Sequence, residues 1–265
     1  MATKKAGSKA VAVAPQANIA EIEKEMSENA KALAKRIGGP SRNKISVLPS
    51  GKFRLPDGEE RESLFITVLD FTNKNWFYSQ QYDEKNIVPP DCYAQGDVIE
   101  DMVPLDAVPA KQSDACATCD MNQFKSAQNG RGKACKNTRE LAVLIVDEDG
   151  THNEADAPIY ILSISPKSLA AFDTYVRNVS RLLKGYPIKA IVEITAQPMG
   201  TYSQVVFHQP EANPDFGVHW LRREEARALL EAPPDFTPRE QAKPAARTNA
   251  RPTPRRAGAA PRAGR

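Results

Sequence analysis

The four cysteines of this 265-residue chain lie close together in the sequence, and they constrain the fold more than any other feature. Cys116 and Cys119 form a C-x-x-C pair, Cys92 precedes the pair and Cys135 follows it. Four thiolates that include such a pair are the ligand set of a tetrahedral Zn²⁺ site. We therefore predict a structural zinc site that ties residues 92–135 into one unit.

Three other interpretations of these thiols stay open. The spacing C-x23-C-x2-C-x15-C is not a common zinc-finger spacing, so the zinc prediction rests on the number of ligands and on the one pair. Two disulfides would suit a secreted chain, and an iron–sulfur cluster also takes four thiolates. The last interpretation is four buried thiols with no connection between them.

The composition predicts a cytoplasmic protein without a membrane partner. The N-terminal sequence MATKKAGSKAVAVAPQ has lysines but only a short, broken apolar run, which fits neither a signal peptide nor an anchor. No window approaches the roughly 18 apolar residues that a membrane span needs. We therefore expect reduced thiols, which again favours a metal over disulfides.

The charge is divided between a basic C-terminal segment and a slightly acidic remainder. Residues 241–265 hold seven Lys or Arg and no acid, which leaves 29 basic and 33 acidic residues elsewhere, a net charge of −4. A globally basic binding surface is thus excluded, and any contact with nucleic acid must be local. The basic segment would itself attract phosphates in a salt-dependent way.

Composition and periodicity divide the chain into four segments. We predict that residues 1–17 are a disordered leader and that residues 233–265 are a disordered basic tail, because both segments lack the apolar content of a core. The spacing of apolar residues within 18–39 predicts an amphipathic helix with an apolar stripe. The stripe consists of Ile19, Ile22, Met26, Ala30, Leu33 and Ile37. Residues 40–232 are then the folded domain.

The folded domain is predicted to be α+β and mainly β. Apolar and aromatic runs indicate strands within 45–58, 63–82, 139–150, 158–165, 189–198 and 202–210. Helices are expected at 166–185 and 216–232, and the acidic, Pro-rich stretch 83–115 has turn chemistry throughout. Strands with one long helix between them fit an OB-like antiparallel barrel. The zinc-braced loop 92–139 would be an insertion, and the shorter helices would flank the barrel.

No motif supports catalysis. The chain has no phosphate-binding Gly-x-x-x-x-Gly-Lys-Ser/Thr loop, no Gly-x-Ser-x-Gly elbow and no His-Glu-x-x-His helix. The acidic residues fall in loops without a metal-binding pattern. We therefore expect a protein that is not an enzyme and has no small-molecule substrate. A nuclease or glycosylase with an iron–sulfur cluster is the enzymatic alternative.

Basic and aromatic residues close to the cysteines favour nucleic acid as the ligand. Gly130 and Gly132 would let backbone N–H groups approach phosphates, whereas a solvated loop held by the metal is the simpler alternative. Rings near residue 76 could stack on bases, although most aromatic residues pack in a core. The predicted contacts are Lys125, Arg131, Lys133, Lys136 and Arg139 in the acid-free stretch, with Trp76, Tyr78 and Tyr82 as stacking residues.

Three stretches of the chain resemble a family of bacteriophage single-stranded-DNA-binding proteins of OB-fold type. They are DCYAQGD, CATCDMNQFKSAQNGRGKACKNTRELAVL and ISPKSLAAFDTYVRNV, and the resemblance covers roughly residues 40–232. It implies that the protein coats single-stranded DNA during phage DNA replication or recombination, in the cytoplasm of the host bacterium. It also implies zinc on the four cysteines, DNA along the basic loop, and phage replication proteins as partners.

One departure from the family pattern bears on those partners. Many replicative single-strand binders recruit partner proteins through an acidic tail, whereas residues 241–265 are basic, so recruitment by that route is in doubt. We predict sequence-tolerant binding of single-stranded DNA. The alternative is a protein–protein adaptor of the phage replication or transcription machinery in which zinc serves stability alone, and the net acidity of residues 1–240 favours it.

Overall fold

The computed structural model describes residues 43–80, 88–149, 151, 157–234 and 236. The predicted leader, the predicted helix at 18–39, the stacking candidate Tyr82 and nearly all of the predicted tail lie outside the described residues. The strands are β1 Lys44–Val47, β2 Phe53–Arg54, β3 Glu60–Arg61, β4 Ser63–Phe77, β5 Cys92–Gly96, β6 Lys136–Ile145, β7 Tyr160–Ile164, β8 Ala190–Pro198, β9 Ser203–Phe207 and β10 Glu211–Ala212.

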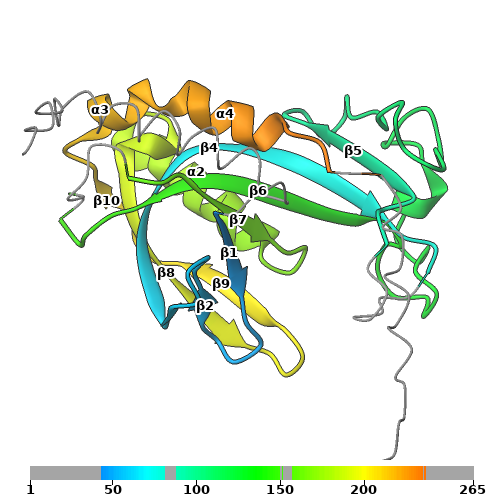
Figure 1. Cartoon of the computed structure of the whole chain (residues 1–265), viewed down its shortest axis with the longest axis horizontal. Coiled ribbons are helices and arrows are strands. Elements are labelled where there is room, and N and C mark those ends of the chain that lie inside the picture. The colour runs from blue at the N-terminus through cyan, green and yellow to red at the C-terminus, as the bar shows by residue number, and fades with distance from the viewer. Residues whose placement is uncertain (1–42, 81–87, 150, 152–156, 235, 237–265) are drawn as a thin grey trace, which may run out of the picture.

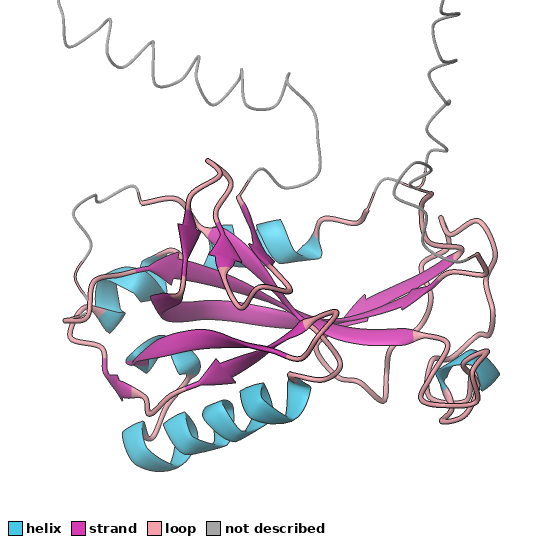
Figure 2. Ribbon diagram, turned by 90° about the horizontal axis from the view of Figure 1, so that it is seen from below, coloured by secondary structure: helices cyan, strands magenta, loops and turns pink. Residues whose placement is uncertain are grey.

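The strands form one curled sheet with the long strand β4 at its centre (Figure 1). β4 pairs antiparallel with β6 along most of its length, with β8 at its first residues and with β5 at its last. β6 continues to β7 and β8 to β9, both antiparallel. β1 then joins β7 in parallel, so the sheet is mixed rather than purely antiparallel. Figure 2 shows how the strands curl into a half-barrel, which confirms the α+β, mainly β class.

Two tight turns carry the chain from β1 to β3, as the sequence predicts. Gly51 and Gly58 have φ of 84° and 94°, a conformation that residues with a Cβ rarely adopt. They close the antiparallel pairs β1–β2 and β2–β3. Ser50-Gly51 and Asp57-Gly58 are typical turn dipeptides, so the sequence of residues 45–58 predicts both turns, and the structure confirms them.

A β-bulge in β4 sets which of its side chains face the core. Val68 pairs with Val143 and Asp70 pairs with Ala142, so Leu69 is the extra residue on the β4 side. Up to Val68, every second residue of β4 packs in the larger core cluster. The extra residue reverses the alternation, so that Phe71 continues that packing and the carboxylate of Asp70 turns to the opposite face.

Each face of the sheet is covered by helical elements. The helical elements are η1 Asp120–Asn122, α2 Leu169–Leu183, η2 Pro187–Lys189, α3 Phe216–Leu221 and α4 Arg223–Glu231. Phe172, Tyr175 and Val179 of α2 enter the larger core cluster. Ala226 and Leu230 of α4 pack in a second cluster on the opposite face, against β4, β6 and β7. The described helices include none with the length and apolar character needed to cross a membrane.

Several boundaries of the predicted elements differ from the structure. α2 begins at Leu169 rather than at residue 166, because the Ser168 hydroxyl accepts the backbone N–H of Val205 at 3.0 Å and residues 165–168 form a turn. The expected helix at 216–232 is broken at Arg222 into α3 and α4. β5 lies within the stretch 83–115, for which only turns were expected.

Candidate functional site

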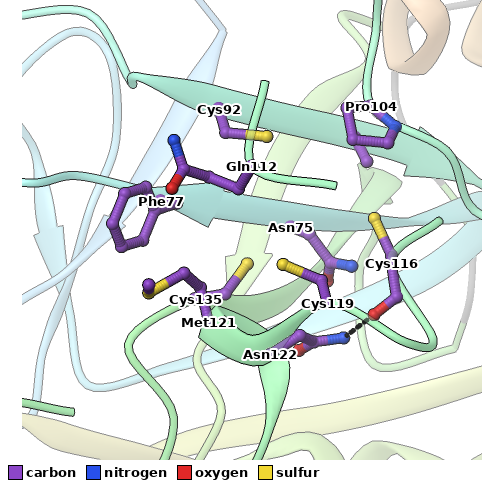
Figure 3. Close-up of a pocket in the computed structure, with 11 residues that line it drawn as sticks. Asn75, Phe77, Cys92, Pro104, Gln112, Cys116, Cys119, Met121, Asn122 and Cys135 are labelled. Atoms are coloured by element: carbon purple, nitrogen blue, oxygen red, sulfur yellow. Dashed lines mark hydrogen bonds between the residues drawn. The ribbon is translucent and has the colours of Figure 1, made fainter. Parts of the chain in front are cut away.

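The four cysteines converge on one small pocket at the far end of β4. Cys92 opens β5 and pairs with Phe77 of β4. Cys116 and Cys119 lie in the turn before η1, and Cys135 directly precedes β6. The four thiols line the same pocket, and Figure 3 shows their sulfur atoms directed toward its centre. Residues 92–135 are thereby drawn together around the thiols.

Burial in the pocket disfavours ionisation of the Cys116 and Cys135 thiols in the protein alone. All four cysteines are buried, and none forms a disulfide. Burial raises the pKa of the Cys135 thiol to about 12, and the neighbouring Cys116, Cys119 and Cys92 add to the rise. Burial also raises the pKa of Cys116. A compensating positive charge would favour the thiolates of these two cysteines, and a bound metal ion supplies such a charge.

The four thiols do not occupy the positions that ligands take around a metal ion. Among the described residues, no group of three or more His, Cys, Asp or Glu side chains is arranged so that it could hold a metal ion. The donor set fits zinc chemically, because four thiols share one small pocket. Zinc therefore stays a prediction.

The basic loop, residues 123–136, is held by hydrogen bonds of its own. The Lys125 N–H donates to the Gly132 carbonyl at 2.7 Å, and the Cys135 N–H donates to the Met121 carbonyl at 2.8 Å. The Ser126 hydroxyl accepts the Ala134 N–H at 2.9 Å. The loop therefore presents its side chains from a defined backbone that begins and ends at the cysteine pocket.

A network of three asparagines joins the cysteine pocket to the basic loop. Asn122 donates to the Cys116 carbonyl at 2.8 Å, and its own carbonyl oxygen accepts from Asn137 at 2.9 Å. Asn137 also donates to Asn75 on β4 at 2.6 Å. The ammonium of Lys133 donates to Asn137 at 3.0 Å and to Asn122 at 3.3 Å. The position of this cation thus depends on the turn that carries the cysteines.

A groove of about 520 Å³ lies between the end of β4 and the basic loop. Phe77 and Met121 line both this groove and the cysteine pocket, so the two sites share a wall. No Asp or Glu occurs among the described residues that line the groove. The lining residues are Phe77, Tyr78, Ser79, Gln80, Met121, Ser126, Ala127, Gln128, Asn129, Lys133, Ala134 and Lys136.

The groove brings together three of the residues predicted to contact nucleic acid. Tyr78 and Lys136 both line it, and the lysine Nζ lies over the tyrosine ring, 6.0 Å from the ring centroid. Lys133 lies on the same wall and also approaches the ring of Phe124 at 5.7 Å. Lys125 and Arg131 are exposed on the basic loop but do not line the groove.

Arg139 has a different place from the other predicted cations. Only 8% of its surface is exposed, and it forms an ion pair with Asp173 of α2. Its Nε donates to Asn73 at 2.8 Å, and its guanidinium lies over the rings of Phe71 and Phe172. The Arg139 cation pairs with a carboxylate inside the protein and joins α2 to the sheet. We therefore no longer expect Arg139 to contact phosphate.

Trp76 faces away from the groove. Neighbouring residues of a strand point to opposite faces, and Phe77 faces the cysteine pocket. The indole of Trp76 instead packs 4.6 Å from the ring of Tyr93, and its N–H donates to the Thr138 hydroxyl at 2.9 Å. Of the two predicted stacking residues that the structure describes, Tyr78 therefore lies in the groove and Trp76 does not.

The amides and hydroxyls of the groove were missed from the sequence. Gln80, Gln128, Asn129 and Ser79 line it beside the two lysines. Such side chains are frequent in any loop, so their residue types carry no signal about a shared cavity. Their position becomes apparent only when the end of β4 and the basic loop are seen to be neighbours.

Comparisons with protein-family models, with curated proteins and with solved structures found no match for this chain.

Proposed function

We propose that the protein binds single-stranded DNA without strong sequence preference, through the groove between Tyr78 and the basic loop. The observation that carries this proposal is the composition of the groove wall, in which rings and cations occur without a carboxylate among the described lining residues. Rings bind bases by stacking, and cations attract the phosphates between them. Coating of DNA in phage replication or recombination stays a prediction from the resemblance.

The shape of the groove favours a single strand over a duplex. It lies in a loop region beside the sheet rather than on a projecting helix, so the described residues of this site offer no element that would enter a major groove. Side-chain amides and hydroxyls along the wall can bond to bases whose edges are unpaired. A strand with unstacked bases meets these requirements.

The order of strand pairing supports an OB-like barrel as the scaffold. β4, β6 and β7 form a meander, α2 follows, and β8 returns beside β4 before pairing with β9. A five-stranded barrel with a helix between its strands has this order, and its ligands bind at the loop that follows the first strand. The connection from β4 to β6 holds both the cysteine pocket and the groove. We propose that it is that binding loop.

We also propose that the four cysteines bind one structural Zn²⁺ ion. The ion would supply the charge that stabilises four thiolates. The thiols and the asparagine network would then hold Lys133 at the groove. Metal analysis tests this directly, because a colourless protein with one zinc per chain supports the proposal, whereas visible absorbance would favour an iron–sulfur cluster.

Reversing the two groove cations is expected to weaken binding of single-stranded DNA by ten-fold or more at low salt. The change is Lys133→Glu with Lys136→Glu, and the affinity for a fluorescent oligo-dT is measured by anisotropy at several salt concentrations. Two phosphate contacts fewer should also reduce the slope of log affinity against log salt by about 1.4.

The matched control is Lys44→Glu with Lys167→Glu, which makes the same change of charge at exposed positions on β1 and before α2. We expect this control to bind nearly as the parent does. Equal loss in both double variants would show that only net charge matters. No loss in the groove variant, or a preference of the parent for duplex DNA, would overturn the proposed function.

A further inference from the structure

Exposed apolar side chains remain on α3. This short helix lies at the opposite end of the sheet from β5 (Figure 1). Leu221 is 82% exposed, Val218 55% and Trp220 48%. Large apolar side chains gathered in this way mark an interaction surface rather than ordinary exposure. The name α3 face is used here for the exposed apolar residues of α3, which are Phe216, Val218, Trp220 and Leu221.

The α3 face is held outward by a buried anchor. His219 is fully buried between these residues, and Asn213 lies 2.8 Å from its Nδ1 while also donating to the Ile188 carbonyl at 2.8 Å. α3 cannot rotate to bury Val218 or Leu221 without removing His219 from this site. The exposed side chains therefore need a cover from outside the described residues.

The chain enters the described region beside the residues that lead into β7, which Arg222 at the α3–α4 junction also contacts. Asn43 donates through its side chain to the Ile159 carbonyl at 3.1 Å, and its own carbonyl accepts the Ile161 N–H at 2.8 Å. Two residues before Ile159, the Ala157 carbonyl accepts from Arg222, the residue between α3 and α4. Asn43 and the α3–α4 junction are therefore linked through the short segment 157–159.

The sequence of the segment that precedes residue 43 matches the α3 face. Residues 18–39 have an apolar stripe at helical spacing, from Ile19 to Ile37, whose side chains need an apolar partner. Four residue steps separate position 39 from Asn43, which allows a reach of roughly 14 Å. We propose that residues 18–39 form a helix that docks its apolar stripe on the α3 face of the same molecule.

The fluorescence of Trp220 tests the docking in the full chain. The chain has two tryptophans, so Trp76→Phe leaves Trp220 as the reporter. In this background, Leu33→Glu places a charge in the apolar stripe, whereas Lys31→Glu makes a charge change on the opposite side of the predicted helix. We expect Leu33→Glu to move the emission to longer wavelength and to raise quenching by acrylamide about two-fold, with Lys31→Glu close to the parent.

Two further measurements make the outcome decisive. Ile22→Glu should repeat the effect of Leu33→Glu, and hydrogen exchange in α3 should quicken in both variants. Identical Trp220 emission and exchange in the stripe variants and in Lys31→Glu would overturn the proposal. An effect that fades when the parent is diluted would also overturn it, because the stripe would then cover the face of a second copy. None of these readouts depends on binding of DNA.

Discussion

Cys119→Ser is expected to expose residues 116–135 to proteolysis and to lower the affinity for oligo-dT by about ten-fold, while the sheet stays folded. Serine removes one of the four thiols that line the pocket, so a zinc ion would lose a ligand. The Asn122 N–H donates to the Cys119 carbonyl at 2.9 Å, and Asn122 in turn holds Lys133. Disorder in the turn should therefore reach the groove. Limited proteolysis with mass spectrometry, zinc content and anisotropy measure the three effects.

Thr118→Ala is the matched control for this prediction. Thr118 lies between the two cysteines of the turn, is exposed and does not line the pocket. We expect this variant to keep its zinc, its resistance to protease and its affinity for oligo-dT. Cleavage of the sheet as fast as the loop in Cys119→Ser would contradict the prediction, because the thiols would then support the whole fold.

The strands that could be predicted from the sequence are those whose burial is reflected in their own length and residue composition. β4, β6 and β8 are long and rich in branched and aromatic residues, because they are buried on both faces by α2 and α4. β5 has only the sequence CYAQG, set among prolines and acids, and its pairing with the end of β4 makes it a strand. Local strand propensity does not reveal such a strand, because its formation depends on pairing with a strand distant in the sequence.

The candidate site could likewise be predicted only in part from the sequence. Convergence of the cysteines follows from their chemistry, and the structure gathers them as predicted, although not at coordinating positions. The difference between Lys133 and Arg139 could not be read from the chain, because both belong to one basic stretch. Only the packing of α2, which brings Asp173 to Arg139, separates the groove cation from the internal one.

Trp76 shows the same limit for aromatic residues. Alternation along β4 correctly places Trp76 and Phe77 on opposite faces, but alternation does not say which face meets the groove. The bulge at Leu69 decides this, since an extra residue reverses the faces of everything that follows it. A strand pattern therefore assigns pairs of residues to faces, and the three-dimensional fold assigns the faces to a function.

Phe172→Ala is expected to lower the free energy of unfolding by about 3–5 kcal/mol, because it leaves a cavity where α2 meets the sheet. The Phe172 ring is fully buried, packs edge-on against Phe71 at 5.1 Å between centroids, and lies under the guanidinium of Arg139. Its loss removes apolar contacts and also the ring beneath a buried cation. Urea titration followed by circular dichroism measures the change.

Phe124→Ala is the control, since that ring is 78% exposed and its removal should change stability by less than about 0.5 kcal/mol. An equal effect of the two substitutions would mean that α2 does not depend on this contact for its position on the sheet.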